Sequence, residues 1–65
     1  MKNYEKSVRE VLESNGCTFV RRGAGEYEIW QSAVTGKYFP VDLEIKSRRH
    51  ANIVLRHGGV MAVDI

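Results

Sequence analysis

The spacing of apolar residues along the chain changes from a helical period to an extended one and back again. In residues 3–15 apolar positions recur every three or four residues, which predicts an amphipathic helix. The positions of that stripe are Tyr4, Val8, Val11 and Leu12. Asn3 is suited to cap the start of the helix, and Gly16 is suited to end it in the left-handed conformation. Glu5 and Arg9, four residues apart, are expected to pair on its solvent face.

Three stretches with a period of two follow, at residues 17–22, 27–33 and 37–45, and we interpret each as a β-strand. In the third, the apolar face comprises Phe39, Val41, Leu43 and Ile45. The other face comprises Tyr38, Pro40, Asp42 and Glu44. Gly36 allows a turn before this strand, and Pro40, which has no N–H to donate, indicates a strand at the edge of the sheet. Such alternation is typical of a sheet with one buried and one solvated face.

A second helix is predicted from Ser47, a capping residue, to about His57. Its core-facing positions are Ala51, Val54, Leu55 and Gly58. Residues 60–65 are short and apolar, and they either add a strand or pack against the sheet. The order α-β-β-β-α predicts an α+β fold in which both helices cover one face of a three-stranded antiparallel sheet. This is the layout of double-stranded RNA-binding domains.

Length and composition limit what the protein can do. Its 65 residues are expected to form a single domain, residues 1–65, with no space for a cofactor-binding fold or a deep cleft. Cys17 is the only cysteine and cannot form an internal disulfide, and no stretch has the length of a signal peptide or a membrane span. We therefore expect a cytoplasmic protein without a cofactor. His50 and His57 lie two helical turns apart, about 10.5 Å, so no metal site is expected.

Positive charge gathers at the start of the second predicted helix. The net charge is only +2, but residues 45–60 carry basic side chains and no acid. Lys46, Arg48 and Arg49 lie at the helix start, where the helix dipole also favours a phosphate. These three residues are candidate contacts to an RNA backbone, and the alternative is an ordinary solvated helix face.

A glycine-rich connection joins the first two predicted strands. Gly23 and Gly25 let the chain turn tightly and let another backbone approach closely. Arg21 and Arg22 precede the glycines, and all four residues are candidates for contacting RNA. The alternative is a plain hairpin turn.

Taken together, these motifs resemble those of the HicA family, the small mRNA-cleaving toxins of HicA–HicB toxin–antitoxin pairs. The resemblance covers roughly residues 5–60. The matching motifs are Asn15-Gly16, Glu28-Ile29-Trp30, Thr35-Gly36-Lys37, Phe39-Pro40-Val41, Ile45-Lys46-Ser47-Arg48, Ala51-Asn52 and Val54-Leu55. The resemblance implies a metal-independent endoribonuclease, an mRNA interferase of a type II system, with mRNA and a HicB-type antitoxin as its partners.

One position departs from the family pattern. The family signature is a glycine, a histidine two residues later and an aromatic residue three further on, so that Gly25 and Trp30 place Tyr27 at the catalytic histidine position. Imidazole, with a pKa of about 6.5, transfers protons at neutral pH, whereas a phenol, with a pKa of about 10, is a poor base there. Tyrosine can still hydrogen-bond a phosphate and stack on a base, so we expect RNA binding to survive where cleavage does not. Trp30 is expected in the core, on the opposite face from Tyr27.

The residues leave several alternatives open. Tyr27 is either a natural variant whose role has moved to binding or an inactivating substitution, since histidine and tyrosine codons differ by one base. His50 is either a substitute proton carrier beside the basic helix start or an exposed helix residue. A non-catalytic RNA-binding module of the same fold and a protein-interaction domain for an antitoxin-like partner are the alternative functions.

Overall fold

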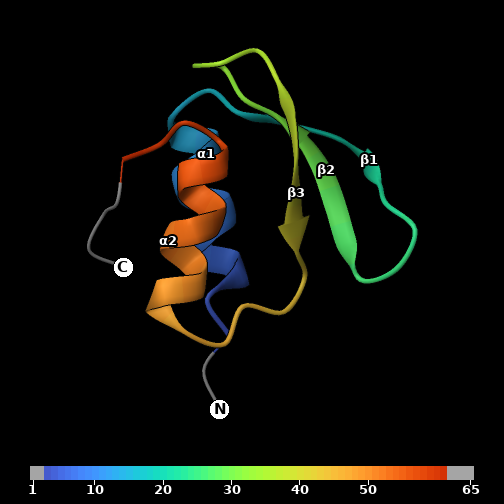
Figure 1. Cartoon of the computed structure of the whole chain (residues 1–65), viewed down its shortest axis with the longest axis vertical. Helices are drawn as coiled ribbons and strands as arrows, with labels where there is room; N and C mark the ends of the chain where they lie inside the picture. Colours follow the sequence, from blue (N-terminus) through green and yellow to red (C-terminus); the bar gives the residue numbers. More distant parts are fainter. Residues whose placement is uncertain (1–2, 62–65) are drawn as a thin grey trace.

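Along the chain, one helix precedes and one helix follows a three-stranded sheet, and the two helices lie side by side (Figure 1). The computed structural model describes residues 3–61. In chain order the elements are α1 (Glu5–Ser14), β1 (Thr18–Arg22), β2 (Tyr27–Gln31), β3 (Tyr38–Asp42) and α2 (Arg48–His57). The strand order in the sheet is β1-β2-β3, and both strand pairs are antiparallel. The α+β class and the order α-β-β-β-α predicted from the sequence are confirmed.

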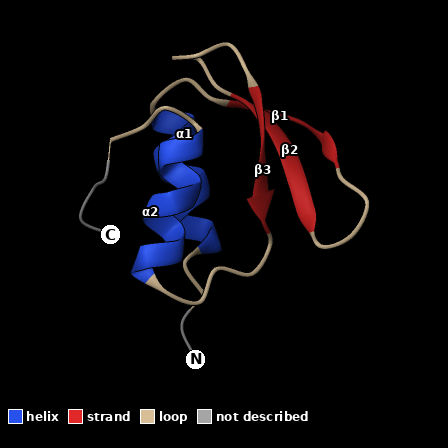
Figure 2. Ribbon diagram, in the orientation of Figure 1, coloured by secondary structure: helices blue, strands red, loops and turns tan. Residues whose placement is uncertain are grey.

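Both helices lie on the same side of the sheet, so its other face is open (Figure 2). The core contains the predicted helical stripes and the inner face of the sheet: Val8, Leu12, Trp30, Phe39, Val41, Ala51, Val54 and Leu55. Burial of these side chains supplies the main favourable free energy of folding, because it removes apolar surface from water. Tyr4 and Val11 pack against this core while partly exposed. Neither helix within residues 3–61 has the length and apolar character needed to cross a bilayer.

The start of α1 differs from the prediction by one residue. Tyr4, not Asn3, occupies the N-cap position, and its side chain forms no capping hydrogen bond. The Tyr4 N–H instead donates to the Ile45 carbonyl at 2.7 Å. Asn3 Oδ1 accepts from the N–H groups of Glu5 and Ile45, both at 3.0 Å, so Asn3 joins the helix start to the segment before α2. At the other end of the helix, Gly16 has φ of +82°, as expected for a left-handed stop.

Strand β2 ends two residues earlier than predicted because the chain turns at Ser32. The buried Ser32 hydroxyl accepts hydrogen bonds from the N–H groups of Val34 and Thr35. It also donates to the Gly58 carbonyl at the end of α2. This single hydroxyl therefore holds the β2–β3 turn against the C-terminal end of the second helix.

Strand β3 is an edge strand, as Pro40 predicted. It is shorter than the predicted 37–45, because the chain leaves the sheet after Asp42. Ile45 is still fully buried, but it reaches the core from the segment that connects β3 to α2. The alternation therefore predicted the burial of Phe39, Val41 and Ile45 correctly, whereas Leu43, predicted on the same face, is only partly buried, and the strand end was predicted incorrectly.

Strand β1 contains an irregularity that the sequence pattern did not predict. Its pairing with β2 passes from Phe19 opposite Trp30 to Arg21 opposite Ile29, so Val20 is an extra residue. A bulge of this kind bends a strand and locally changes which side chains share a face. Phe19 packs edge-on against Trp30, with ring centroids 6.3 Å apart, but remains 48% exposed.

Helix α2 begins and ends as predicted. Ser47 Oγ accepts from the His50 N–H at 3.1 Å, which caps the first turn. The helix ends at Gly58, where a Cβ would lie 2.8 Å from the Phe39 ring, and Gly59 has φ of +79°. Val60 is buried against the core. Residues 60–65 were predicted either to add a strand or to pack against the sheet. Residues 60 and 61 do not form a strand, and residues 62–65 lie outside the described part of the chain.

Candidate functional site

The predicted site residues come from segments that the sheet brings toward one end of the molecule. Tyr27 begins β2 and Asp42 ends β3, and the antiparallel register makes them cross-strand partners. The chain then passes from Asp42 through a short connection to the start of α2 (Figure 1). The β1–β2 connection therefore lies beside Tyr27. The basic start of α2 follows Asp42, the strand partner of Tyr27, along the chain.

The two glycines of the β1–β2 connection are needed for different reasons. A Cβ added at Gly23 would overlap the Tyr27 ring, so the ring packs directly on the backbone there. Gly25 has φ of +116°, a conformation that side chains other than glycine rarely adopt. The Gly23 N–H donates to the Tyr27 carbonyl at 3.0 Å and closes the hairpin. The Tyr27 side chain therefore packs against the backbone of this connection.

Tyr27 lies on the open face of the sheet. Along β2, Tyr27 and Ile29 are half-buried on the outer face, whereas Glu28 and Trp30 are buried on the inner face. Trp30 is only 1% exposed. The predicted core position of Trp30, on the opposite face from Tyr27, is confirmed.

A histidine–aspartate pair joins the end of β3 to the first turn of α2. His50 Nε2 lies 2.7 Å from Asp42 Oδ2, and their side chains are 37% and 49% exposed. The Ser47 cap orients the first turn of α2, because the backbone N–H of His50 donates to its hydroxyl. Sequence reasoning considered each residue alone and missed the pair, since no periodic pattern relates a strand end to a helix start across a connection.

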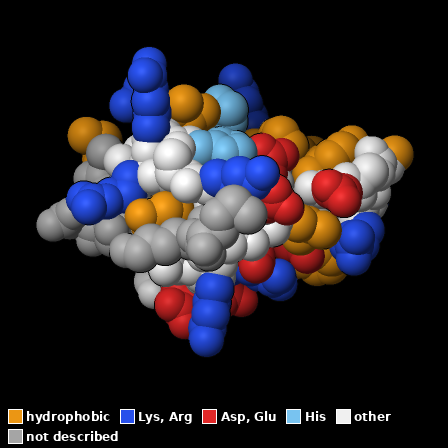
Figure 3. Space-filling model, turned by 90° about the horizontal axis from the view of Figure 1, so that it is seen from below, with side chains coloured by type: hydrophobic (Ala, Val, Ile, Leu, Met, Phe, Trp, Pro, Cys, Tyr) orange, Lys and Arg blue, Asp and Glu red, His pale blue; other side chains and the backbone are white. Residues whose placement is uncertain are grey.

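The basic residues at the start of α2 are exposed, but they do not form an uninterrupted positive surface. Lys46 Nζ lies 3.0 Å from Glu44 Oε1, and both side chains are more than half exposed. Arg48 and Arg49 are exposed in the first turn of the helix. Basic side chains project at several places around this end of the molecule, with acidic and histidine side chains between them (Figure 3). Glu44 lies one residue outside the acid-free segment identified in the sequence, and its charge offsets that of Lys46.

Arg21 and Arg22 point to opposite faces of the sheet. Arg21 is the cross-strand partner of Ile29 on the outer face, and Arg22 is the partner of Glu28 on the inner face. Arg21 Nη1 donates to the Arg22 carbonyl at 3.2 Å. Only Arg21 therefore shares a face with Tyr27.

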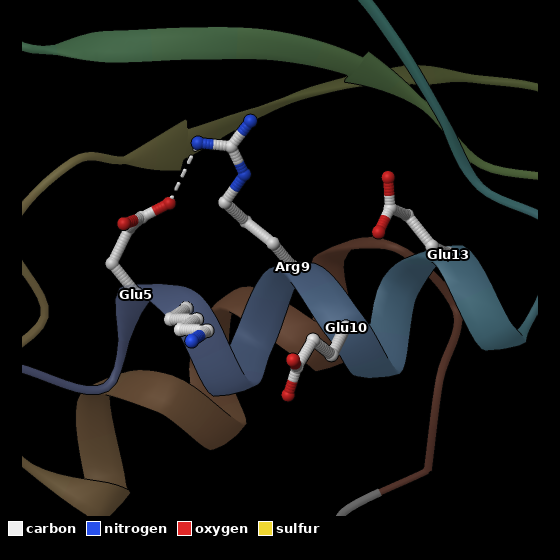
Figure 4. Close-up of a pocket in the computed structure, with 5 residues that line it drawn as sticks. Glu5, Arg9, Glu10 and Glu13 are labelled. Carbon is white, nitrogen blue, oxygen red and sulfur yellow. Dashed lines mark hydrogen bonds and ion pairs between the residues drawn. The ribbon is translucent and has the colours of Figure 1, made fainter.

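Glu28 is buried on the inner face of β2, next to Tyr27 in the chain. The Trp30 indole N–H donates to Glu28 Oε1 at 3.0 Å, and Arg9 Nη1 of α1 lies 3.7 Å from Glu28 Oε2. Arg9 also donates to Glu5 at 2.9 Å, the predicted pair, and its side chain extends from α1 toward the sheet (Figure 4). The hydrogen bond to Glu5 raises the pKa of Arg9 above its usual value, and the charge of Glu28 adds to this effect. This network fixes β2 against α1 and so supports the strand that carries Tyr27.

Sequence reasoning assigned no structural role to Glu28, although a signal was present. Glu28 lies two residues before Trp30, so a buried Trp30 places Glu28 on the buried face as well. A glutamate at such a position requires a charged or hydrogen-bonding partner, because an unpaired buried charge is costly. Arg9 supplies the charge, because it extends toward the sheet and not into solvent as predicted, and the Trp30 indole supplies a hydrogen bond.

The open face also carries an apolar hollow of about 390 Å³, lined by Val20, Arg21, Ile29 and Tyr38. Tyr38 is 65% exposed there. Among residues 3–61, no three His, Cys, Asp or Glu side chains come together in a way that could hold a metal ion.

Comparisons with models of known families, with curated proteins and with solved structures find no match to this chain. Support for a function therefore comes from the residues described above and from the sequence motifs.

Proposed function

We propose that the protein is a HicA-like RNA-binding protein, a metal-independent endoribonuclease scaffold in which Tyr27 occupies the position of the catalytic histidine. One observation carries the proposal. Tyr27, at the signature position, is the cross-strand partner of Asp42, and Asp42 contacts the first turn of the helix that carries the basic residues. A phosphate bound at the helix start would therefore lie on the same side of the molecule as the Tyr27 position.

The charge distribution favours RNA at this end of the molecule. The first turn of α2 has no acidic residue and carries Arg48 and Arg49, and the positive end of the helix dipole adds to their attraction for an anion. Helix α1 is more acidic, because a hollow on its surface is lined by Glu5, Glu10 and Glu13 together with Lys6 and Arg9. A polyanion is therefore attracted more strongly to the start of α2 than to the surface of α1.

Within this proposal Tyr27 binds RNA but does not catalyse its cleavage efficiently. Its ring, held on Gly23, can stack on a base, and its hydroxyl can donate to a phosphate oxygen. Neither interaction moves a proton at the attacking 2′-hydroxyl at neutral pH, since a phenol is a weak base. The protein would act in the cytoplasm, where it meets mRNA.

A second candidate function, docking of a partner protein, is favoured by the open sheet face. Val20, Ile29 and Tyr38 line an apolar hollow there, and Phe19 at the neighbouring edge is 48% exposed. Apolar surface of this kind is typical of the centre of a protein interface. For a HicA-like protein the partner would be a HicB-type antitoxin.

Replacing Lys46, Arg48 and Arg49 together with alanine should weaken RNA binding for every sequence tested. Each lost phosphate contact should reduce the slope of log K against log salt by about 0.7 for single strands and about 0.9 for duplexes. Fluorescence anisotropy with labelled RNA at several salt concentrations measures both quantities. Arg56→Ala is the matched control, because Arg56 is an exposed arginine at the opposite end of the same helix. A triple variant with the salt slope of the unmodified protein would exclude these residues from the RNA site.

A further inference from the structure

The contact between His50 and Asp42 could transfer protons, a role that the proposed function does not assign to it. Both side chains are partly exposed, so a ligand in solvent can reach them. They come from different elements, β3 and α2, and meet at 2.7 Å. The open face beside them carries Tyr27, the cross-strand partner of Asp42.

The contact fixes how the imidazole presents its two nitrogens. An ionised carboxylate only accepts hydrogen bonds, so Nε2 of His50 carries the hydrogen that Asp42 Oδ2 accepts. In the neutral imidazole the other nitrogen, Nδ1, then has a free lone pair and can act as a base. A carboxylate in this position also stabilises the imidazolium that forms when Nδ1 takes up a proton.

The surroundings of this pair suit a phosphodiester substrate. Arg48 and Arg49 immediately precede His50 in the first turn of α2, and Lys46 precedes the Ser47 cap. The charged groups around the imidazole are thus Asp42 on β3, Glu44 paired with Lys46 in the connection, and the two arginines on α2. An RNA phosphate bound by these basic residues would therefore lie near the imidazole of His50.

We propose that His50 is the proton-transfer group of this protein and that Asp42 positions it, so that the chain retains slow RNA cleavage although Tyr27 replaces the signature histidine. This inference rests on the proposed RNA-binding function and adds a catalytic pair to it. The pair lies at the Tyr27 end of the sheet, because Asp42 is the strand partner of Tyr27 and the hydrogen-bond partner of His50.

The step requires no further reactant. Nδ1 of His50 accepts the proton of the RNA 2′-hydroxyl, and the 2′-oxygen forms a bond to the adjacent phosphorus. The bond between phosphorus and the 5′-oxygen of the next nucleotide breaks, and that oxygen takes a proton from water. The imidazolium returns its proton to solvent. The products are a 2′,3′-cyclic phosphate and a 5′-hydroxyl, so atoms and charge balance.

The simplest alternative is that the pair only ties α2 to β3. His50→Gln separates the two roles, because glutamine has an N–H₂ group that can still donate to Asp42 but has no nitrogen base. Asp42→Asn keeps the shape of the side chain and removes its charge. His57→Gln is the matched control, since His57 is an exposed histidine at the far end of the same helix.

The experiment incubates each protein with end-labelled single-stranded RNA in EDTA, and it measures cleavage rate, product ends and RNA affinity in parallel. We expect slow cleavage by the unmodified chain with 2′,3′-cyclic phosphate ends, a loss of about 10²–10⁴-fold in rate in His50→Gln, and no change in His57→Gln. RNA affinity should change less than twofold in His50→Gln. In Asp42→Asn the rate should fall, and ¹⁵N NMR of the imidazole should show loss of the preference for the Nε2–H tautomer.

The outcomes distinguish the two proposals. RNA binding without cleavage, or equal cleavage by His50→Gln and the unmodified protein, would overturn the role of His50 and leave RNA binding intact. A chain that does not bind RNA would overturn the proposed function and this inference together. Cleavage that depends on His50 but leaves the imidazole tautomer unchanged in Asp42→Asn would remove Asp42 as a positioning residue.

Discussion

Replacing Tyr27 with histidine is expected to raise the rate of RNA cleavage by about 10²–10⁴-fold, the usual contribution of general acid–base catalysis. The position is already held by its surroundings, because the hairpin closes through Gly23 and the β2 strand is fixed by the buried Glu28 network. An imidazole is smaller than a phenol, so it fits the space that the Tyr27 ring occupies over Gly23. Single-turnover cleavage in EDTA measures the effect, and expression of Tyr27→His without an antitoxin should inhibit growth.

Tyr38→His is the control for this substitution. Tyr38 lies on the same open face of the sheet at the other end of β3 and is 65% exposed, so the same chemical change is made away from Asp42 and His50. It should leave the cleavage rate unchanged. If folded Tyr27→His protein binds RNA but neither cleaves it faster nor slows growth, the nuclease scaffold is rejected and the non-catalytic RNA-binding module is favoured.

Leu55→Ala should lower the free energy of unfolding by about 2–5 kcal/mol. Leu55 is 0% exposed in the core that α2 forms with α1 and the sheet. At about 0.05–0.15 kcal/mol per residue, a chain of this length has only about 3–10 kcal/mol of stability in total. The substitution should therefore unfold a measurable fraction of the protein at moderate temperature. Urea denaturation followed by circular dichroism gives the value.

Ile53→Ala is the matched control for the core substitution, because Ile53 lies on the same helix with 43% of its surface exposed. It should cost well under half as much as Leu55→Ala. Equal effects of the two substitutions would mean that α2 does not pack through the face described above.

The helices and the open sheet face could be predicted because each depends on a local periodic pattern. The stripe of α2, its Ser47 cap and its glycine end are all encoded within one short segment, and all agree with the structure. Pro40 likewise identified an edge strand from a single residue property, the missing N–H. Tyr27 and Trp30 were assigned to opposite faces by strand alternation alone, and the structure agrees.

The features that were missed depend on contacts between elements. The bulge at Val20 follows from the pairing of β1 with β2, and no property of Val20 itself indicates it. The Asp42–His50 pair requires the end of β3 and the first turn of α2 to be placed relative to each other. The buried Glu28 was detectable from its spacing to Trp30, but its partner Arg9 lies on a different element. The periodicity of the sequence predicts which face of a helix or strand a residue occupies. Its contact partner on another element is determined by tertiary packing.

The central claim is that RNA binds where the β1–β2 connection, the end of β3 and the start of α2 meet. Titrating the ¹⁵N-labelled protein with a 2′-O-methylated RNA, which cannot be cleaved through its 2′-oxygen, tests this claim residue by residue. We predict that amide chemical shifts change in residues 23–27 and 42–50 and remain constant along the acidic side of α1. Shift changes confined to α1, or the absence of any change at saturating RNA, would contradict the account.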